Sequence, residues 1–149
     1  MTQAVQGATV GALIQSGAEQ LAQAGVVFGH GTTNAWDEAA WLVLWRLGLA
    51  LDSVLEEGVA DSVANRTVTP ANQALVATLF EERIATRKPA AYLTREAWLQ
   101  GVPFYVDERA IVPRSFIAEL LAGGGIDDWL SDQTRNVLDL CTGKIGRAH

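Results

Sequence analysis

Residues 29–49 have the sequence GHGTTNAWDEAAWLVLWRLGL, and this stretch decides the fold of the first half of the chain. Its glycines and the Thr-Thr-Asn run predict a turn, and either Thr33 or Asn34 can cap the helix that follows. Asp37 and Glu38 fall in the first turn of that helix, where the helix dipole favours negative charge. Apolar residues at three- and four-residue spacing predict its buried stripe: Trp36, Ala40, Val43, Leu44 and Leu47.

Three further segments predict helices around this one. The apolar residues from Val10 to Leu21 follow one helical face, and Gly25 is a plausible stop. Residues 51–64, LDSVLEEGVADSVA, predict a weaker and shorter helix broken by Gly58. Four apolar stripes with caps can bury one another, so residues 1–88 are predicted to form a helical bundle.

The last helix of this bundle has the clearest start. Thr69 is a cap and Pro70 stands at the first helical position, while Pro89 ends the helix. Its predicted apolar stripe is Leu75, Val76, Leu79, Phe80 and Ile84. A mixed charge run is expected to form a solvated face: Glu81, Glu82, Arg83, Arg87 and Lys88.

After Pro89 the pattern changes from helical to strand-like. Aromatic and β-branched residues flank Gln100-Gly101, which predicts a β-hairpin. FIAELLAGGG, residues 116–125, predicts one or two helical turns, and IDDWLSDQT, residues 126–134, a second amphipathic piece. NVLDL, residues 136–140, predicts a short buried strand.

Composition excludes several classes of protein. With 49% hydrophobic residues and a net charge of −6, the chain is expected to be globular, soluble and mildly acidic, which argues against broad nucleic-acid binding. No apolar run approaches the roughly 18 residues of a membrane span, and the N-terminus lacks a signal-peptide pattern. The single cysteine, Cys141, allows no internal disulfide, so we expect a cytoplasmic protein. Two histidines and one cysteine, far apart, do not predict a zinc site.

Three segments are candidate sites on the basis of their residues. Lys144 does not belong to a phosphate loop, because Leu138 stands where glycine is needed and Ile145 where serine or threonine is needed. His30, between two glycines, is either a general base or a partly exposed turn residue. Residues 139–143 are either a cofactor loop, whose glycine lets the backbone approach a ligand, or a buried strand entering a tight turn. Within them Cys141 is expected to be a small buried hydrophobe.

Several segments together resemble the protein-glutamine methyltransferases. They are RKPAAYL (87–93), FYVDER (104–109), VPR (112–114) followed by Ser115, and the upstream GHGTTNAWDEA (29–39). Within that family the chain resembles the members that modify a large-subunit ribosomal protein, rather than those that modify release factors, which carry Pro-Glu-Thr after the arginine. Phe116 departs from the proline usual at its position.

The resemblance implies a mainly α chain in three parts. Residues 1–88 would be a helical substrate-recognition domain, 89–115 a β-hairpin linker, and 116–143 the truncated start of a Rossmann-like α/β methyltransferase domain. The implied reaction methylates a glutamine side-chain nitrogen of a large-subunit ribosomal protein, with S-adenosylmethionine as the cofactor. The implied cofactor-binding residues are Arg114, Asp139, Leu140, Cys141, Thr142 and Gly143.

The end of the chain departs from the family pattern. Lys144 and Ile145 stand where more serine, threonine or glycine is usual, and the Asn-Pro-Pro-Tyr catalytic loop of the family occurs nowhere in the chain. Residues 144–149 are therefore expected to be a non-native tail, since one set of codons for KIGRAH matches a common sequencing adapter. We expect the fragment to be inactive, without catalytic residues of its own. The alternatives are a stand-alone helical module that docks on a ribosomal protein, and a helical domain of another role.

Overall fold

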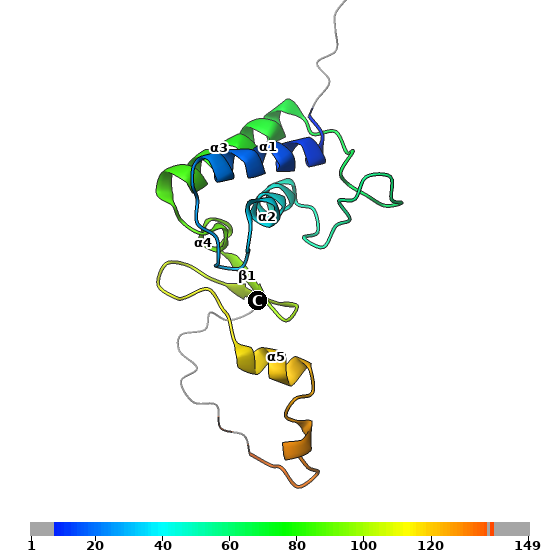
Figure 1. Cartoon of the computed structure of the whole chain (residues 1–149), viewed down its shortest axis with the longest axis vertical. Coiled ribbons are helices and arrows are strands. Elements are labelled where there is room, and N and C mark those ends of the chain that lie inside the picture. Colours follow the sequence, from blue (N-terminus) through cyan, green and yellow to red (C-terminus); the bar gives the residue numbers. More distant parts are fainter. Residues whose placement is uncertain (1–7, 137, 139–149) are drawn as a thin grey trace, which may run out of the picture. The chain divides into compact units, whose positions relative to one another are not determined.

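The computed structural model describes residues 8–136 and 138. The chain divides into two compact units, Met1–Thr94 and Arg95–His149. The described part is mainly helical, with one two-stranded antiparallel sheet. In chain order its elements are α1 (Val10–Gln23), α2 (Ala35–Leu47), α3 (Pro70–Thr86), α4 (Ala90–Thr94), β1 (Glu96–Leu99), β2 (Val102–Tyr105), α5 (Phe116–Ala122) and the 3₁₀ turn η1 (Asp127–Trp129) (Figure 1).

Side-chain caps begin the three long helices of the first unit. Thr9 accepts a hydrogen bond from the amide of Ala12, and the Asn34 side chain accepts one from the amide of Asp37 at 2.9 Å. Thr69 caps α3, and Pro70 follows it as the first helical residue. The predicted caps of α2 and α3 are therefore confirmed, with Asn34 rather than Thr33 as the capping residue of α2.

The core of the first unit lies between α1, α2 and α3, with α4 packed on α2 and α3 (Figure 1). Gly17 lets α1 approach α3 closely, because a Cβ atom there would lie 2.0 Å from the Cζ of Phe80. The most deeply buried core residues are Val10, Ile14, Leu21, Ala39, Leu42, Val43, Leu44, Val76, Phe80 and Ala90.

Residues 51–64 form turns, so the prediction of a helix there is wrong. Gly58 and Asp61 both have positive φ angles, of 80° and 66°, which interrupt a right-handed helix. The backbone folds back on itself instead, and the amide of Val63 donates to the carbonyl of Val54 at 2.9 Å. Residues 126–134 likewise form only the single 3₁₀ turn η1.

Two predicted stripe residues lie outside the core. Trp36 is 41% exposed and Leu75 is 43% exposed. Trp36 stands in the first turn of α2, next to its cap, where the helix end leaves the core. Leu75 precedes the buried Val76 by one residue, and this step turns a helical side chain by about 100° toward solvent.

The predicted hairpin is present in the second unit. β1 and β2 pair with Trp98 opposite Pro103 and Leu99 opposite Val102. Gln100 and Gly101 link the strands with φ angles of 49° and 75°, as a two-residue type I′ turn requires. The predicted helical segment at residue 116 is confirmed as α5. Of the predicted strand at 136–140, only Asn136 and Leu138 are described, and neither is in a strand.

Candidate functional site

The predicted cofactor segment falls almost wholly outside the described residues. This holds for Asp139, Leu140, Cys141, Thr142 and Gly143. Arg114 is described, and it is exposed in the loop before α5. The next residue, Ser115, caps α5 by accepting a hydrogen bond from the amide of Ala118 at 3.2 Å. The cap therefore fixes the backbone immediately after Arg114, and the arginine side chain is accessible to a ligand.

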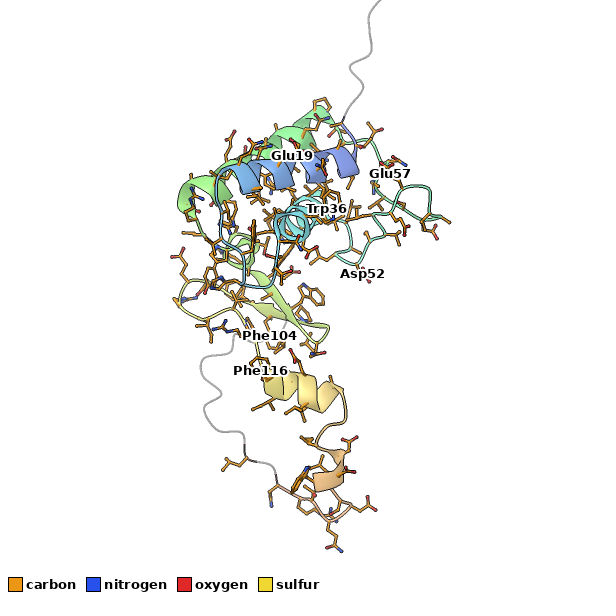
Figure 2. The ribbon with its side chains drawn as sticks, in the orientation of Figure 1. Glu19, Trp36, Asp52, Glu57, Phe104 and Phe116 are labelled. Atoms are coloured by element: carbon orange, nitrogen blue, oxygen red, sulfur yellow. The ribbon has the colours of Figure 1, made fainter. Side chains whose placement is uncertain are left out.

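Helix α5 carries large apolar side chains that are exposed. Phe116 is 83% exposed and Ile117 is 61% exposed, and no residue of α5 is buried (Figure 2). Leu120 and Leu121, one turn further along, each expose more than half of their surface. An exposed apolar group of this kind is typical of a surface that packs against other protein.

An ion pair closes the loop that follows the hairpin. The Asp107 carboxylate accepts hydrogen bonds from the backbone amide and the guanidinium of Arg109, with Nη2 at 2.5 Å from Oδ2. These side-chain and backbone hydrogen bonds to Arg109 lower the pKa of Asp107 from 3.8 to about 2. The Tyr105 hydroxyl donates a longer bond to the same carboxylate, at 3.4 Å. Asp107 and Arg109 thus fix the loop that follows β2, and the Asp107 carboxyl stays ionised over the physiological range.

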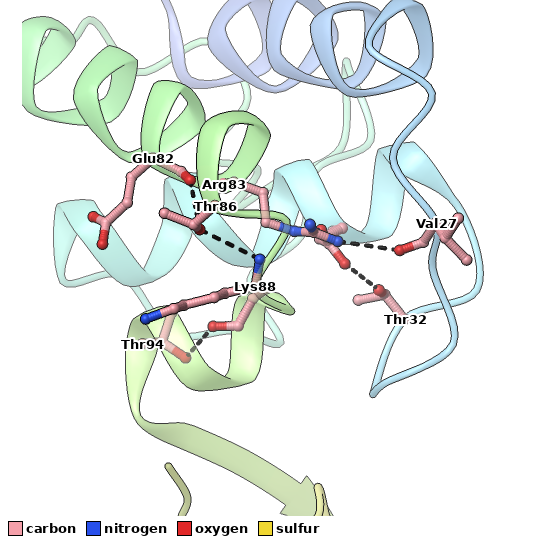
Figure 3. A network of polar contacts seen from close by, with 9 residues as sticks. Val27, Thr32, Glu82, Arg83, Thr86, Lys88 and Thr94 are labelled. Carbon is pink, nitrogen blue, oxygen red and sulfur yellow. Dashed lines mark hydrogen bonds and ion pairs between the residues drawn. The ribbon is translucent and has the colours of Figure 1, made fainter. Parts of the chain in front are cut away.

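A buried polar network joins α2, α3 and the turn between α1 and α2 (Figure 3). Arg83 Nε donates to Glu38 Oε1 at 2.6 Å, and the two side chains are only 2% and 3% exposed. Thr32 Oγ1 donates to the other oxygen of Glu38 at 2.8 Å. Arg83 Nη2 also reaches the carbonyl of Val27 at 3.1 Å. Each partner of this pair therefore has a second hydrogen bond, as buried charges require.

The end of α1, which precedes the turn that carries His30, is tied to the end of α3. Arg87 Nη1 donates to the carbonyl of Ala24 at 2.8 Å. Within the turn the amide of Gly29 donates to the carbonyl of Thr32 at 2.8 Å, and Gly31 has a φ angle of 104°. His30 lies exposed between these residues. Its position agrees with the interpretation as a turn residue, and the network behind it is a means of holding the turn in place.

Residues 8–136 and 138 contain neither a metal-binding group nor a membrane-spanning helix. In that range no group of three or more His, Cys, Asp or Glu side chains gathers where a metal ion could bind. None of the helices described there has the length and apolar character needed to cross a membrane.

Comparison with known proteins identifies relatives over most of the chain, although no family model matches it. A protein of Burkholderia pseudomallei named ribosomal protein uL3 glutamine methyltransferase is 44% identical over 137 residues, which cover 91% of this chain and 42% of that protein. A protein of the same name from Bordetella pertussis is 46% identical over 133 residues, covering 88% and 42%. The resemblance to the protein-glutamine methyltransferases is confirmed.

The similarity extends to further proteins of that name but covers only part of each. One from Xylella fastidiosa is 42% identical over 136 residues, which are 91% of this chain and 41% of that protein. The chain thus spans about two fifths of the length of these curated relatives.

Arg83 is the residue whose role the sequence analysis missed. The charge run in α3 was expected to be solvated, and this is wrong for Arg83, which is 2% exposed. A signal was present, because Val76, Leu79, Phe80 and Arg83 follow the spacing of one helical face. The partner of Arg83 was harder to predict, because Glu38 lies 45 residues away in the sequence. The position of Glu38 in the first turn of α2 is also explained by the helix dipole alone.

Proposed function

We propose that the chain is the N-terminal part of an S-adenosylmethionine-dependent methyltransferase that methylates a glutamine side-chain nitrogen of a large-subunit ribosomal protein. The observation that carries this proposal is identity of 42–46% to proteins named ribosomal protein uL3 glutamine methyltransferase over 81–91% of the chain. The activity would reside in a longer polypeptide, since the Asn-Pro-Pro-Tyr loop is absent from these residues. The proposed location is the cytoplasm, where ribosomal proteins are made.

The chemistry explains why a substrate-binding unit is needed. An amide nitrogen is a weak nucleophile because its lone pair is delocalised into the carbonyl. When bound, S-adenosylmethionine would supply a methyl group on a sulfonium sulfur, and its transfer would exchange the S–C bond for an N–C bond with loss of a proton from the nitrogen. Rate enhancement therefore depends on holding the glutamine in line with that methyl group. The helical first unit would contribute by binding the protein that carries the glutamine.

The second unit supplies the start of the cofactor domain in this proposal. Arg114 is exposed and offers a guanidinium that suits a carboxylate, such as that of the methionine part of the cofactor. Residues 139–143 would form the first cofactor loop. The exposed apolar residues of α5 support this assignment, because a helix of a Rossmann-like domain packs its apolar side on a sheet.

A stand-alone protein-binding module is the second candidate. The observation that favours it is the core of the first unit, which is formed by α1 to α4 and the loops between them. A bundle with its own core can bind a ribosomal protein without carrying out chemistry on it.

The test uses an open reading frame that extends this chain to the length of its relatives. The purified product is incubated with bacterial ribosomal protein uL3 and S-adenosylmethionine, and the ribosomal protein is digested and analysed by mass spectrometry. We expect one glutamine to gain a methyl group with the extended protein and none with the 149-residue chain. Binding of uL3 without methylation by the extended protein would favour the module, and neither binding nor methylation would reject both candidates.

A further inference from the structure

The hairpin of the second unit carries two exposed aromatic rings on the same side. Side chains alternate along a strand, so the pairing places Glu96, Trp98, Pro103 and Tyr105 together on one side. We call these four residues the aromatic face. Trp98 is 47% exposed and Tyr105 is 38% exposed. On the opposite side Ala97 is 1% exposed, and Val102 beside the turn is 45% exposed. Both aromatic rings are thus exposed on the same side of the hairpin.

Both rings of the aromatic face are held by carboxylates. Trp98 Nε1 donates to Glu96 Oε1 at 2.6 Å, and the Tyr105 hydroxyl donates to Asp107 Oδ2 at 3.4 Å. Asp107 is in turn fixed by Arg109. These bonds restrict the rings before any partner binds, so less conformational entropy remains to be lost on binding. Exposed Trp and Tyr side chains that are already ordered are the residue types enriched at binding hot spots.

The chemistry of the aromatic face favours a cationic side chain. The face of a tryptophan ring attracts an ammonium or guanidinium group, and a carboxylate at the ring edge adds to that attraction. The chain as a whole carries a net charge of −6. A ribosomal protein, by contrast, needs many lysine and arginine residues to neutralise the phosphates of the RNA on which it sits. The charges of the two partners are therefore complementary.

We propose that the aromatic face is a docking surface for a lysine- or arginine-bearing segment of the ribosomal protein substrate. The inference rests on the proposed function and adds to it the surface and the chemistry of recognition. A cationic side chain stacks on the Trp98 ring beside the Glu96 carboxylate, and Pro103 and Tyr105 extend the apolar contact. The hairpin then takes part in choosing the substrate.

The experiment measures binding of purified bacterial ribosomal protein uL3 to the 149-residue chain by isothermal titration calorimetry. We expect Trp98→Ala to weaken binding by about tenfold or more, since it removes a central aromatic contact. Trp98→Phe keeps a ring and should weaken binding less. Glu96→Gln keeps the acceptor for Trp98 Nε1 but removes the charge, so its effect should shrink as salt is raised. Trp129→Ala is the matched control, because Trp129 is 85% exposed in η1, outside both the hairpin and the helical first unit.

The possible outcomes separate this inference from the proposed function. Equal loss of binding with Trp98→Ala and Trp129→Ala, or no loss with Trp98→Ala, would place the docking surface elsewhere. Absence of binding by the unsubstituted chain would also reject the inference, while methylation by the extended protein would still decide the function. A dimer that Trp98→Ala dissociates would show that a second copy occupies the face. In the extended protein, a lower thermal midpoint for Trp98→Ala with unchanged KM for uL3 would show that the polypeptide itself covers the face.

Discussion

Arg83 and Glu38 form an ion pair whose side chains are 2% and 3% exposed. Replacing Arg83 by methionine would leave the Glu38 carboxylate buried without a cation, and such a change costs about 3–5 kcal/mol of unfolding free energy. Urea unfolding followed by helical circular dichroism measures this loss. The exposed Arg46 of α2 offers a control, and Arg46→Met should change stability by no more than about 0.5 kcal/mol.

The double variant Glu38→Leu/Arg83→Met distinguishes the contribution of the ion pair from the cost of leaving one buried charge unpaired. With both charges removed, no unpaired ion remains in the core, so part of the loss should be recovered. Recovery will be incomplete, because Thr32 and the carbonyl of Val27 lose their partners. If Arg83→Met were as stable as Arg46→Met, the buried pair would contribute nothing to the fold.

Asp107 is the residue whose protonation in the folded chain differs most clearly from its ordinary behaviour. Its pKa is lowered from 3.8 to about 2, first by the side-chain hydrogen bond from Arg109. A carboxyl whose folded pKa is depressed stabilises the fold above its unfolded pKa, and that contribution is lost as pH falls through the folded value. The loss should therefore occur between pH 3.8 and about 2. In an NMR titration of the carboxyl group, Arg109→Gln should raise the pKa of Asp107 toward 3.8, and an unchanged midpoint would contradict this cause.

Single-residue roles were predictable from the sequence where they depend on near neighbours. The side chains of Asn34 and Thr69 each accept a hydrogen bond from the backbone amide three residues later in the chain. Both residues were predicted as caps, Asn34 with Thr33 as the alternative. Arg83 was not placed correctly, because its burial depends on Glu38 in a different helix. The role of Asp107 depends on the shape of a loop that spacing does not specify. The cofactor residues 139–143 remain a prediction, since they lie outside the described range.

At the scale of elements, α1 and α3 meet where α1 has no side chain. An added Cβ at Gly17 would lie 2.0–2.6 Å from three atoms of the Phe80 ring. Alanine in place of glycine gains about 1 kcal/mol of helix propensity, but overpacking a filled core costs about 1–3 kcal/mol. We therefore expect Gly17→Ala to lower the thermal midpoint. The neighbouring exposed position, Ser16→Ala, should leave it unchanged or raise it, and a stabilised Gly17→Ala would show that the two helices separate at little cost.

The ends of helices and strands could be predicted from the sequence where strong capping or turn residues mark them. The Thr69-Pro70 start and the Gln100-Gly101 turn were predicted because caps, prolines and positive-φ residues act locally. Residues 51–64 were predicted as a helix from a weak apolar pattern, whereas Gly58 and Asp61 adopt positive φ angles. Even one left-handed residue breaks the hydrogen-bond pattern of a short helix. The apolar pattern was therefore given too much weight against the glycine. The exposed side of α5 was not foreseen, because burial depends on what packs against an element.

At the scale of the whole molecule, α4 lies where the predicted and observed boundaries differ. The sequence predicts a recognition domain of residues 1–88, and the structure divides the chain after Thr94. Ala90 is fully buried in the core of the first unit, and Leu93 packs against that core. Helix α4 also contacts both α2 and α3. The first unit is therefore complete only when α4 is included.

Two shortened chains test this boundary. A chain of residues 1–94 should melt cooperatively with a helical circular dichroism spectrum, because it retains every element of the first core. A chain of residues 1–88 lacks the buried Ala90 and the partly buried Leu93. Full burial of a leucine contributes about 1.5–3 kcal/mol, and Leu93 should contribute a part of that. For a domain of this size each 1 kcal/mol shifts the thermal midpoint by about 4–8 °C, so the shorter chain should melt several degrees lower. The control is the chain of residues 1–94 with Leu93→Ala, which keeps α4 but lacks the leucine side chain. Its thermal midpoint should lie between those of the unsubstituted 1–94 and 1–88 chains. Equal midpoints for residues 1–88 and 1–94 would mean that α4 belongs to the linker, as the sequence pattern predicts.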